Sequence, residues 1–295
     1  MLSSSILAPL SLILAATVWG LVWYPYRLLE EAGISGSVAS LLTYLVGLPL
    51  LLLLVDRRRL FERSERGLLL ALALAAGWTN LAYVLAVIHG EVMRVLLLFY
   101  LAPLWTVFFA RLLLAEKAGR MAYAVIGLSF AGAYVMLSES GGLPLPTNAA
   151  EWLGLSAGIG FALTNVLTRK ISSAPIALRS LAVFAGVVVL SAFYALHEGS
   201  SPQIVLTLDV QGWWMVVGIA LALLLATFTV QYGLARTPAN RAIVILLSEL
   251  VIAAIASRYL ADEKMNLQEW IGGAMIVAAT LFSGQLEKKT EPPHV

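Results

Sequence analysis

The chain has 295 residues, of which 60% are hydrophobic and 12% charged, with a mean hydropathy of +0.89 and a net charge of +2. A soluble domain carries about 25% charged residues, so this composition excludes an ordinary soluble protein and indicates that lipid covers much of the surface. The positive charge is small and dispersed, which excludes a nucleic-acid-binding surface. There is no cysteine, so disulfides, thiolate metal sites and cysteine nucleophiles are excluded as well.

Ten apolar stretches are each long enough to cross a bilayer as a helix, which takes about 20 residues. The first follows Met1 without the basic region of a secretory signal and exceeds the length of its apolar run, so we expect it to be retained. The stretches do not alternate as transmembrane β-strands do. The predicted fold is therefore an all-α integral membrane protein with ten transmembrane helices. They lie at about residues 6–28, 36–55, 67–88, 92–114, 121–138, 151–168, 176–197, 212–235, 239–258 and 268–286.

The Lys and Arg residues predict the orientation of these helices. With the N-terminus in the cytoplasm, 15 of the 19 Lys and Arg residues lie in inner loops or in the tail. The remaining 4, on the outer side, are Arg27, Arg94, Arg258 and Lys264. This asymmetry follows the positive-inside rule. We therefore predict a multi-pass protein of the bacterial inner membrane with both termini in the cytoplasm.

The two halves of the chain match at a constant spacing of 147 positions near their ends. The matched pairs are Arg94 and Arg241, Arg111 and Arg258, Leu113 and Leu260, Glu116 and Glu263, and Lys117 and Lys264. Since five spans per half is an odd number, the second half must enter the membrane from the opposite side. We expect two inverted repeats, 1–140 and 150–286, and a cytoplasmic tail at 287–295. Such repeats are typical of secondary transporters. Arg94 and Arg241 are interpreted as arginines that snorkel to the interface.

Four short motifs carry a resemblance to a known family. They are Trp19-Gly20, Leu101-Ala102-Pro103-Leu104-Trp105, Leu113-Leu114-Ala115-Glu116-Lys117 and Leu260-Ala261-Asp262-Glu263-Lys264. In this order the chain resembles the ten-helix EamA-type members of the drug/metabolite transporter superfamily, and most narrowly the YddG-type exporters of aromatic and other amino acids. The resemblance implies a central cavity lined by spans one, three, four, six, eight and nine, and export without ATP. Leu250 stands where the second repeat of this family often has a proline matching Pro103, which argues against a symmetric hinge in the ninth span.

Candidate substrate-binding residues are the polar and aromatic groups deep in the predicted spans, where burial in lipid is costly. They are Trp19, Trp23, Trp78, Asn80, Tyr83, Tyr100, Asn165, Gln231, Ser248 and Glu249, with Pro103 as a hinge. Trp19 and Trp23 are spaced to share one helix face. Three interpretations of Glu249 stay open: it holds a substrate ammonium, carries a coupling proton, or is a protonated acid bonded to a neighbouring helix. The aromatic residues also fit a lipid-interface belt, and the polar ones interhelical hydrogen bonds.

Signals for an enzyme are weak. The motif Gly154-Leu155-Ser156-Ala157-Gly158 matches G-x-S-x-G, but it lies inside an apolar span without a partner histidine. We expect no catalytic residue, no metal and no cofactor. The predicted function is a monomeric secondary transporter that exports amino acids or similar small metabolites by alternating access, with membrane lipid around it and without ATP or nucleic acid. A multidrug exporter of lipophilic cations and a membrane enzyme or lipid-handling protein are the alternatives.

Overall fold

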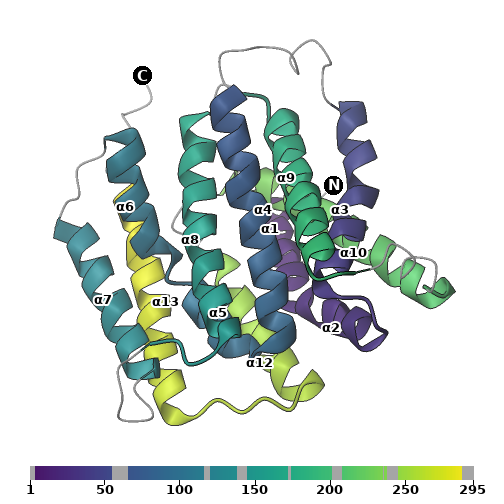
Figure 1. Cartoon of the computed structure of the whole chain (residues 1–295). Coiled ribbons are helices and arrows are strands. Elements are labelled where there is room, and N and C mark those ends of the chain that lie inside the picture. Colours follow the sequence, from purple (N-terminus) through teal and green to yellow (C-terminus); the bar gives the residue numbers. More distant parts are fainter. Residues whose placement is uncertain are drawn as a thin grey trace.

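The structure, a computed structural model, describes residues 4–54, 66–115, 120–137, 145–171, 174–200, 208–234, 236–237 and 245–287. Regular structure in this part of the chain is helical throughout (Figure 1). The helices are α1 Ser4–Leu21, α2 Trp23–Glu31, α3 Gly36–Leu54, α4 Arg66–His89, α5 Val92–Phe99, α6 Ala102–Leu114, α7 Arg120–Leu137, α8 Ala149–Lys170, α9 Ile176–His197, α10 Val210–Leu234, α12 Ser248–Leu260 and α13 Leu267–Glu287. Glu116, Lys117, Arg241, the side chain of Gln231 and the tail from residue 288 lie outside the described residues.

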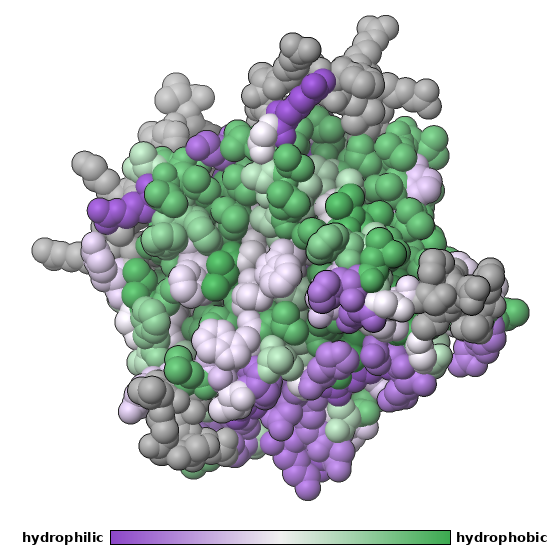
Figure 2. All heavy atoms as spheres, in the orientation of Figure 1, coloured by the Kyte–Doolittle hydropathy of each residue, from purple (hydrophilic) through white to green (hydrophobic). Residues whose placement is uncertain are grey.

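These helices correspond to the ten predicted spans, because α1 and α2 together form the first and α5 and α6 together form the fourth. Six segments are long and apolar enough to cross a membrane, namely 6–31, 36–53, 66–89, 92–114, 176–197 and 210–230. Two shorter apolar helices, Tyr123–Met136 and Leu267–Phe282, accompany them. Hydrophobic residues cover most of the visible surface, and hydrophilic ones gather along its lower edge (Figure 2). The predicted all-α membrane fold is confirmed.

The two halves of the chain pack through matched pairs of helices. Helix α3 packs on α9, and α7 packs on α13, so a helix of the first half meets its counterpart in the second (Figure 1). Helix α4 packs on α8 as α10 packs on α1, and α4 packs on α9 as α10 packs on α3. If the first five segments are exchanged for the last five, the first two contacts convert into themselves and the others convert into one another in pairs, as an internal repeat requires.

Glycines allow these crossings to be close. A Cβ atom on Gly186 of α9 would lie 1.9 Å from the carbonyl oxygen of Ala73 on α4, and one on Gly77 would lie 2.5 Å from the carbonyl oxygen of Gly186. Helices α7 and α13 meet in the same way at Gly132 and Gly272, where an added Cβ would lie 2.8 Å and 2.6 Å from the partner glycine's carbonyl oxygen. Small residues at helix crossings are the usual means of close packing in membranes.

Replacing Gly186 with valine is expected to lower the stability of the bundle by about 3 kcal/mol, at the upper end of typical overpacking costs, because the backbone of α4 cannot move aside. Gly218→Val in α10 is the matched control, since a Cβ there meets no atom within 4 Å. The measurement is the melting temperature of the detergent-solubilised protein. Equal melting temperatures for the two variants would show that the α4–α9 crossing tolerates a side chain.

Three of the predicted spans have a short turn between two helical segments. The first is interrupted at Val22 between α1 and α2, and the fourth at Tyr100 and Leu101 between α5 and α6. The ninth has a turn at Leu247 just before α12. Leu247 lies 147 positions after Tyr100, so the fourth and ninth spans are interrupted at equivalent places.

The expected asymmetry between these two spans was wrong. Pro103 lies in the first turn of α6, where its missing N–H costs no helical hydrogen bond. The ninth span has no proline at the matching Leu250, yet α12 begins there with Ser248 and Glu249. An acidic residue in the first turn of a helix is favoured by the helix dipole, so Glu249 provides a local reason for a helix to start at this point.

Candidate transport site and the adjoining ion-pair network

The interruptions in the fourth and ninth spans are joined by a hydrogen bond between two predicted site residues. Tyr100 Oη donates to Glu249 Oε2 at 2.8 Å, and the residue Glu249 is only 9% exposed. Tyr83, on α4, is close enough to interact electrostatically with the same carboxyl group. Its ring stacks edge-on against Phe99 with 5.6 Å between centroids. The structure thus brings Tyr83, Tyr100, Ser248 and Glu249 into one place, which we call the central cluster.

Several polar atoms in and around the central cluster are buried without a hydrogen-bond partner in the part of the chain that the structure describes. They are Tyr83 Oη and Ser248 Oγ in the cluster and Asn80 Oδ1 one helical turn from Tyr83. The amide nitrogen of Asn80 donates to Tyr44 Oη at 2.9 Å. Buried polar groups are nearly always paired, so this set offers hydrogen-bonding capacity to a polar ligand.

An aromatic group adjoins the cluster. Phe99 lies 5.9 Å from Tyr100 and 5.1 Å from Phe161 of α8, measured between ring centroids. Phe161 is partly exposed. The carboxyl group of Glu249 is therefore linked to the rings of Phe99 and Phe161 through Tyr100. An arrangement of this kind suits a small molecule with a cationic end and an apolar end.

Other predicted residues lie apart from the cluster or have a packing role. Trp23 is fully buried and donates from Nε1 to the carbonyl of Gly20 at 2.9 Å, so its contacts are those of a core residue. Trp19 packs into a different hydrophobic cluster, with Val22 and Tyr26. Trp19 and Trp23 therefore pack into different hydrophobic clusters, although the backbone N–H of Val22 between them still donates to the carbonyl of Val18 at 2.9 Å. Trp78, at 41%, and Asn165 are exposed on α4 and α8.

A network of ion pairs lies at the end of the bundle where α2, α5, α8 and α13 begin or end. Arg27 of α2 donates from Nε to the carbonyl of Val87 at 2.7 Å and from Nη2 to the carbonyl of Gly90 at 2.6 Å. The same Nη2 lies 3.1 Å from Glu263 Oε1. That carboxylate also accepts the backbone N–H of Val92 at 3.0 Å, so it caps the first turn of α5. One carboxylate from the second half thus holds two elements of the first.

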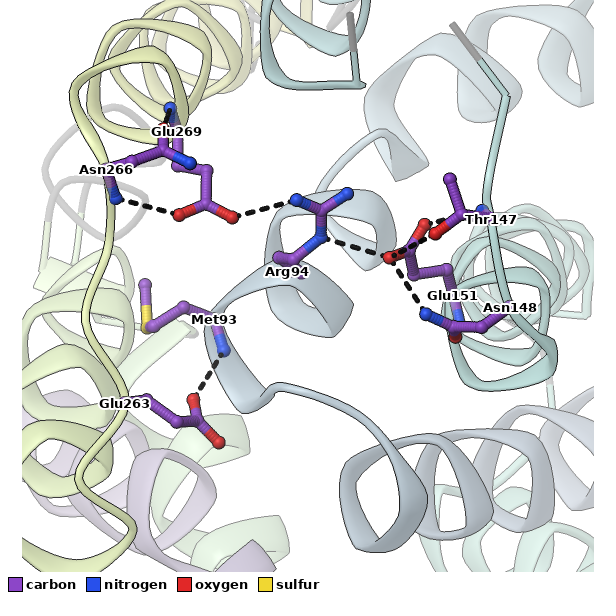
Figure 3. Close-up of polar contacts among 8 residues, drawn as sticks. All are labelled: Met93, Arg94, Thr147, Asn148, Glu151, Glu263, Asn266 and Glu269. Atoms are coloured by element: carbon purple, nitrogen blue, oxygen red, sulfur yellow. Dashed lines mark hydrogen bonds and ion pairs between the residues drawn. The ribbon is translucent and has the colours of Figure 1, made fainter. Parts of the chain in front are cut away.

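Arg94 is the centre of the second part of this network. Its guanidinium is 3.0 Å from Glu151 at the start of α8 and 3.0 Å from Glu269 at the start of α13 (Figure 3). Both glutamates sit three residues after an asparagine, and Asn148 and Asn266 accept their backbone N–H groups at 2.9 Å and 2.8 Å. The interpretation of Arg94 as a snorkelling arginine was wrong, because its charge is paired inside the protein. Asn-x-x-Glu at two helix starts is a capping pattern that could have indicated these partners.

The two ends of the bundle differ in one helix contact along their described residues. Helix α2 packs on α4, and α5 packs on both α12 and α13. In the repeat, α8 corresponds to the span that contains α2, and α10 corresponds to α4. The equivalent contact in the second half would therefore join α8 and α10. Those two helices do not pack closely along their described residues. Burial beside the network, reinforced by Glu269, raises the pKa of Glu91, which sits in the turn between α4 and α5. The end with Arg27 and Arg94 is therefore held by the contact of α2 with α4 as well as by the ion pairs.

Apolar helices that are interrupted around a buried carboxyl group define an integral membrane protein with a polar centre. Among the described residues no group of three His, Cys, Asp or Glu side chains could hold a metal. The profile of the EamA-like transporter family matches residues 6–138 and again residues 148–285. The chain therefore belongs to the EamA-like transporter family, within the drug/metabolite transporter superfamily, and the predicted family is confirmed.

Known relatives agree with this family at the level of fold and general function. An uncharacterized transporter of Archaeoglobus fulgidus is 26% identical over 219 residues, which cover 73% of this chain and 75% of the relative. A solved structure titled "Crystal structure of protein" superposes with a TM-score of 0.60 at 16% identity, covering 97% of this chain and 99% of the other. This similarity shows the shared fold.

Proposed function

We propose that this transporter exports amino acids with neutral or aromatic side chains, in the manner of YddG-type exporters, from the bacterial cytoplasm. The hydrogen bond between Tyr100 and Glu249 carries this proposal, because it places a buried carboxyl group between the interrupted fourth and ninth spans. A carboxylate with one donor can bind the ammonium group of an amino acid by a charge-assisted hydrogen bond. The adjacent rings of Phe99 and Phe161 suit an apolar or aromatic side chain.

The carboxylate of the substrate requires a different partner. The first turns of α6 and α12 begin at Ala102 and Ser248, beside the central cluster. Interrupted helices in transporters commonly direct their N-terminal N–H groups and positive dipole ends at anionic substrate groups. Ser248 Oγ is a further donor without a partner among the described residues. A zwitterion therefore finds complementary groups for both of its charges around the central cluster.

Export by alternating access is supported by the repeat. Two inverted halves, 1–140 and 150–286, exchange their roles when the site opens to the other side. The charge asymmetry of the loops supports an orientation in the inner membrane with both termini and the tail in the cytoplasm. The Arg27–Arg94 network then lies on the outer side and closes that side in this conformation. We expect a monomer surrounded by lipid that has no enzymatic activity and works without ATP, cofactor or nucleic acid.

A second candidate function is the export of lipophilic cations. No Lys or Arg among the described residues bonds to Glu249. A carboxyl group with a phenol donor and aromatic neighbours would also bind a cation that has no carboxylate of its own. Both candidates place the positive charge of the substrate at Glu249, and they differ in whether a negative group accompanies it.

The test is uptake of labelled phenylalanine, threonine and methionine into liposomes that contain the purified protein. Glu249→Gln is expected to lower the initial rate at least tenfold, since one lost charge-assisted hydrogen bond of about 1.5–3 kcal/mol corresponds to that factor or more. Glu31→Gln is the control, because Glu31 is exposed at the end of α2. Transport of tetraphenylphosphonium but of no amino acid would favour the second candidate. Uptake of none of these compounds would contradict both.

A further inference from the structure

Glu249 has a single hydrogen-bond donor in an apolar surrounding. Only Tyr100 donates to it among the described residues. Helix α12 packs on α1 and α5. Helix α1 has no titratable side chain. Helix α5 has only Arg94, whose charge is engaged by Glu151 and Glu269. Tyr83 of α4 is the remaining titratable group beside Glu249 among the described residues.

A carboxylate in such a place cannot stay ionised and unpaired. Burying an unpaired charge costs several kcal/mol, and one phenol donor offsets only part of that cost. The carboxyl group must therefore carry either a proton or a cation. Tyr83 Oη and Ser248 Oγ are buried without a hydrogen-bond partner among the described residues, so neither of them offsets this cost in the present structure.

We propose that Glu249 is a shared exchange site, at which a proton and the ammonium group of the substrate bind in turn and exclude each other. This inference rests on the proposed function. When the substrate binds, the carboxylic acid gives up its proton to water on the cytoplasmic side, and the resulting carboxylate pairs with the ammonium group. When the substrate leaves on the outer side, a proton from that side takes its place. One proton enters the cell for each substrate molecule exported.

The charge that crosses the membrane depends on the class of substrate. The protonated site is neutral. With a zwitterion bound, the carboxylate and the zwitterion together carry one negative charge. Exchange of a proton for an amino acid therefore moves one positive charge inward, and an inside-negative potential drives export. With a monovalent lipophilic cation the loaded site is neutral, so the exchange moves no net charge. The electrical response separates the two candidate functions.

The first test measures proton release on binding. The purified protein in weak buffer with a pH dye is mixed with phenylalanine near neutral pH. We expect about one proton to be released per bound substrate molecule. Because the proton competes with the substrate for the carboxylate, the apparent affinity should fall about tenfold for each unit by which the pH is lowered in the acidic range. Glu249→Gln is expected to release none. Tyr100→Phe keeps the carboxyl group and should still release a proton. Binding without proton release by the wild-type protein would overturn the inference.

The second test follows transport. Liposomes with the protein are loaded with labelled phenylalanine and pyranine and diluted into buffer without substrate. Efflux of phenylalanine is expected to acidify the lumen, because one proton enters for each molecule that leaves. An inside-negative potential, set with valinomycin and a potassium gradient, is expected to speed the efflux of phenylalanine. Efflux without acidification would contradict proton exchange and leave the proposed function intact. Absence of phenylalanine efflux would contradict the proposed function itself.

Discussion

Replacing Arg94 with alanine is expected to lower the stability of the bundle by about 3–5 kcal/mol, the cost of breaking a buried ion pair by removing one partner. The guanidinium is 14% exposed, and its partners Glu151 and Glu269 are 4% and 5% exposed. Without Arg94 these two carboxylates remain buried near each other and have no cation. The loss should appear as a lower melting temperature and a lower yield of monodisperse protein in detergent.

Arg258→Ala is the matched control for this substitution. Arg258 is paired with Asp262, but the two side chains are 48% and 84% exposed. Surface pairs contribute about 0–1 kcal/mol, so the control should melt close to the wild type. A triple variant, Arg94→Met with Glu151→Gln and Glu269→Gln, removes the charges together and should recover part of the stability. If Arg94→Ala has the same melting temperature as Arg258→Ala, the network contributes little to stability.

Replacing Glu263 with glutamine is expected to open the outer end of the bundle. Glu263 is the carboxylate that holds Arg27 and caps α5, and the pair is 19% and 13% exposed. Hydrogen bonds to charged groups contribute about 1.5–3 kcal/mol. In the proposed alternating-access cycle this contact breaks when the outer end opens, so its loss should shift the conformational equilibrium about tenfold or more toward the outward-open state.

The chain has no cysteine, so a single reporter can be added without other changes. Ser248→Cys places a thiol of similar size in the central cluster. A membrane-impermeant maleimide added from the outer side should label it at least tenfold faster in the Glu263→Gln background. Asp262→Asn is the control, because Asp262 is the acidic residue next to Glu263 and its ion pair with Arg258 is exposed to solvent. Asparagine also tolerates the positive φ of 52° at position 262. Equal labelling in both backgrounds would show that the network does not close the bundle.

Much of the fold could be predicted from local and compositional signals. The apolar excess requires a membrane, because only lipid can solvate so many exposed apolar residues, and the length of the apolar stretches sets the number of spans. The spacing of 147 positions pairs Tyr100 with Leu247, and the structure has a turn at both positions. The fourth and ninth spans are interrupted at Tyr100 and Leu247, although only one of them has a proline.

Contacts between distant residues could not be predicted in the same way. Arg94 is 57 positions from Glu151 and 175 from Glu269, and Tyr100 is 149 from Glu249. Helical periodicity predicts neighbours within one helix, but it did not predict that Trp19 and Trp23 pack into different hydrophobic clusters. Composition, charge and repeat determined the membrane fold. Only the tertiary structure decided which charges are paired and that Tyr100 reaches Glu249, because such pairing depends on how separate helices pack.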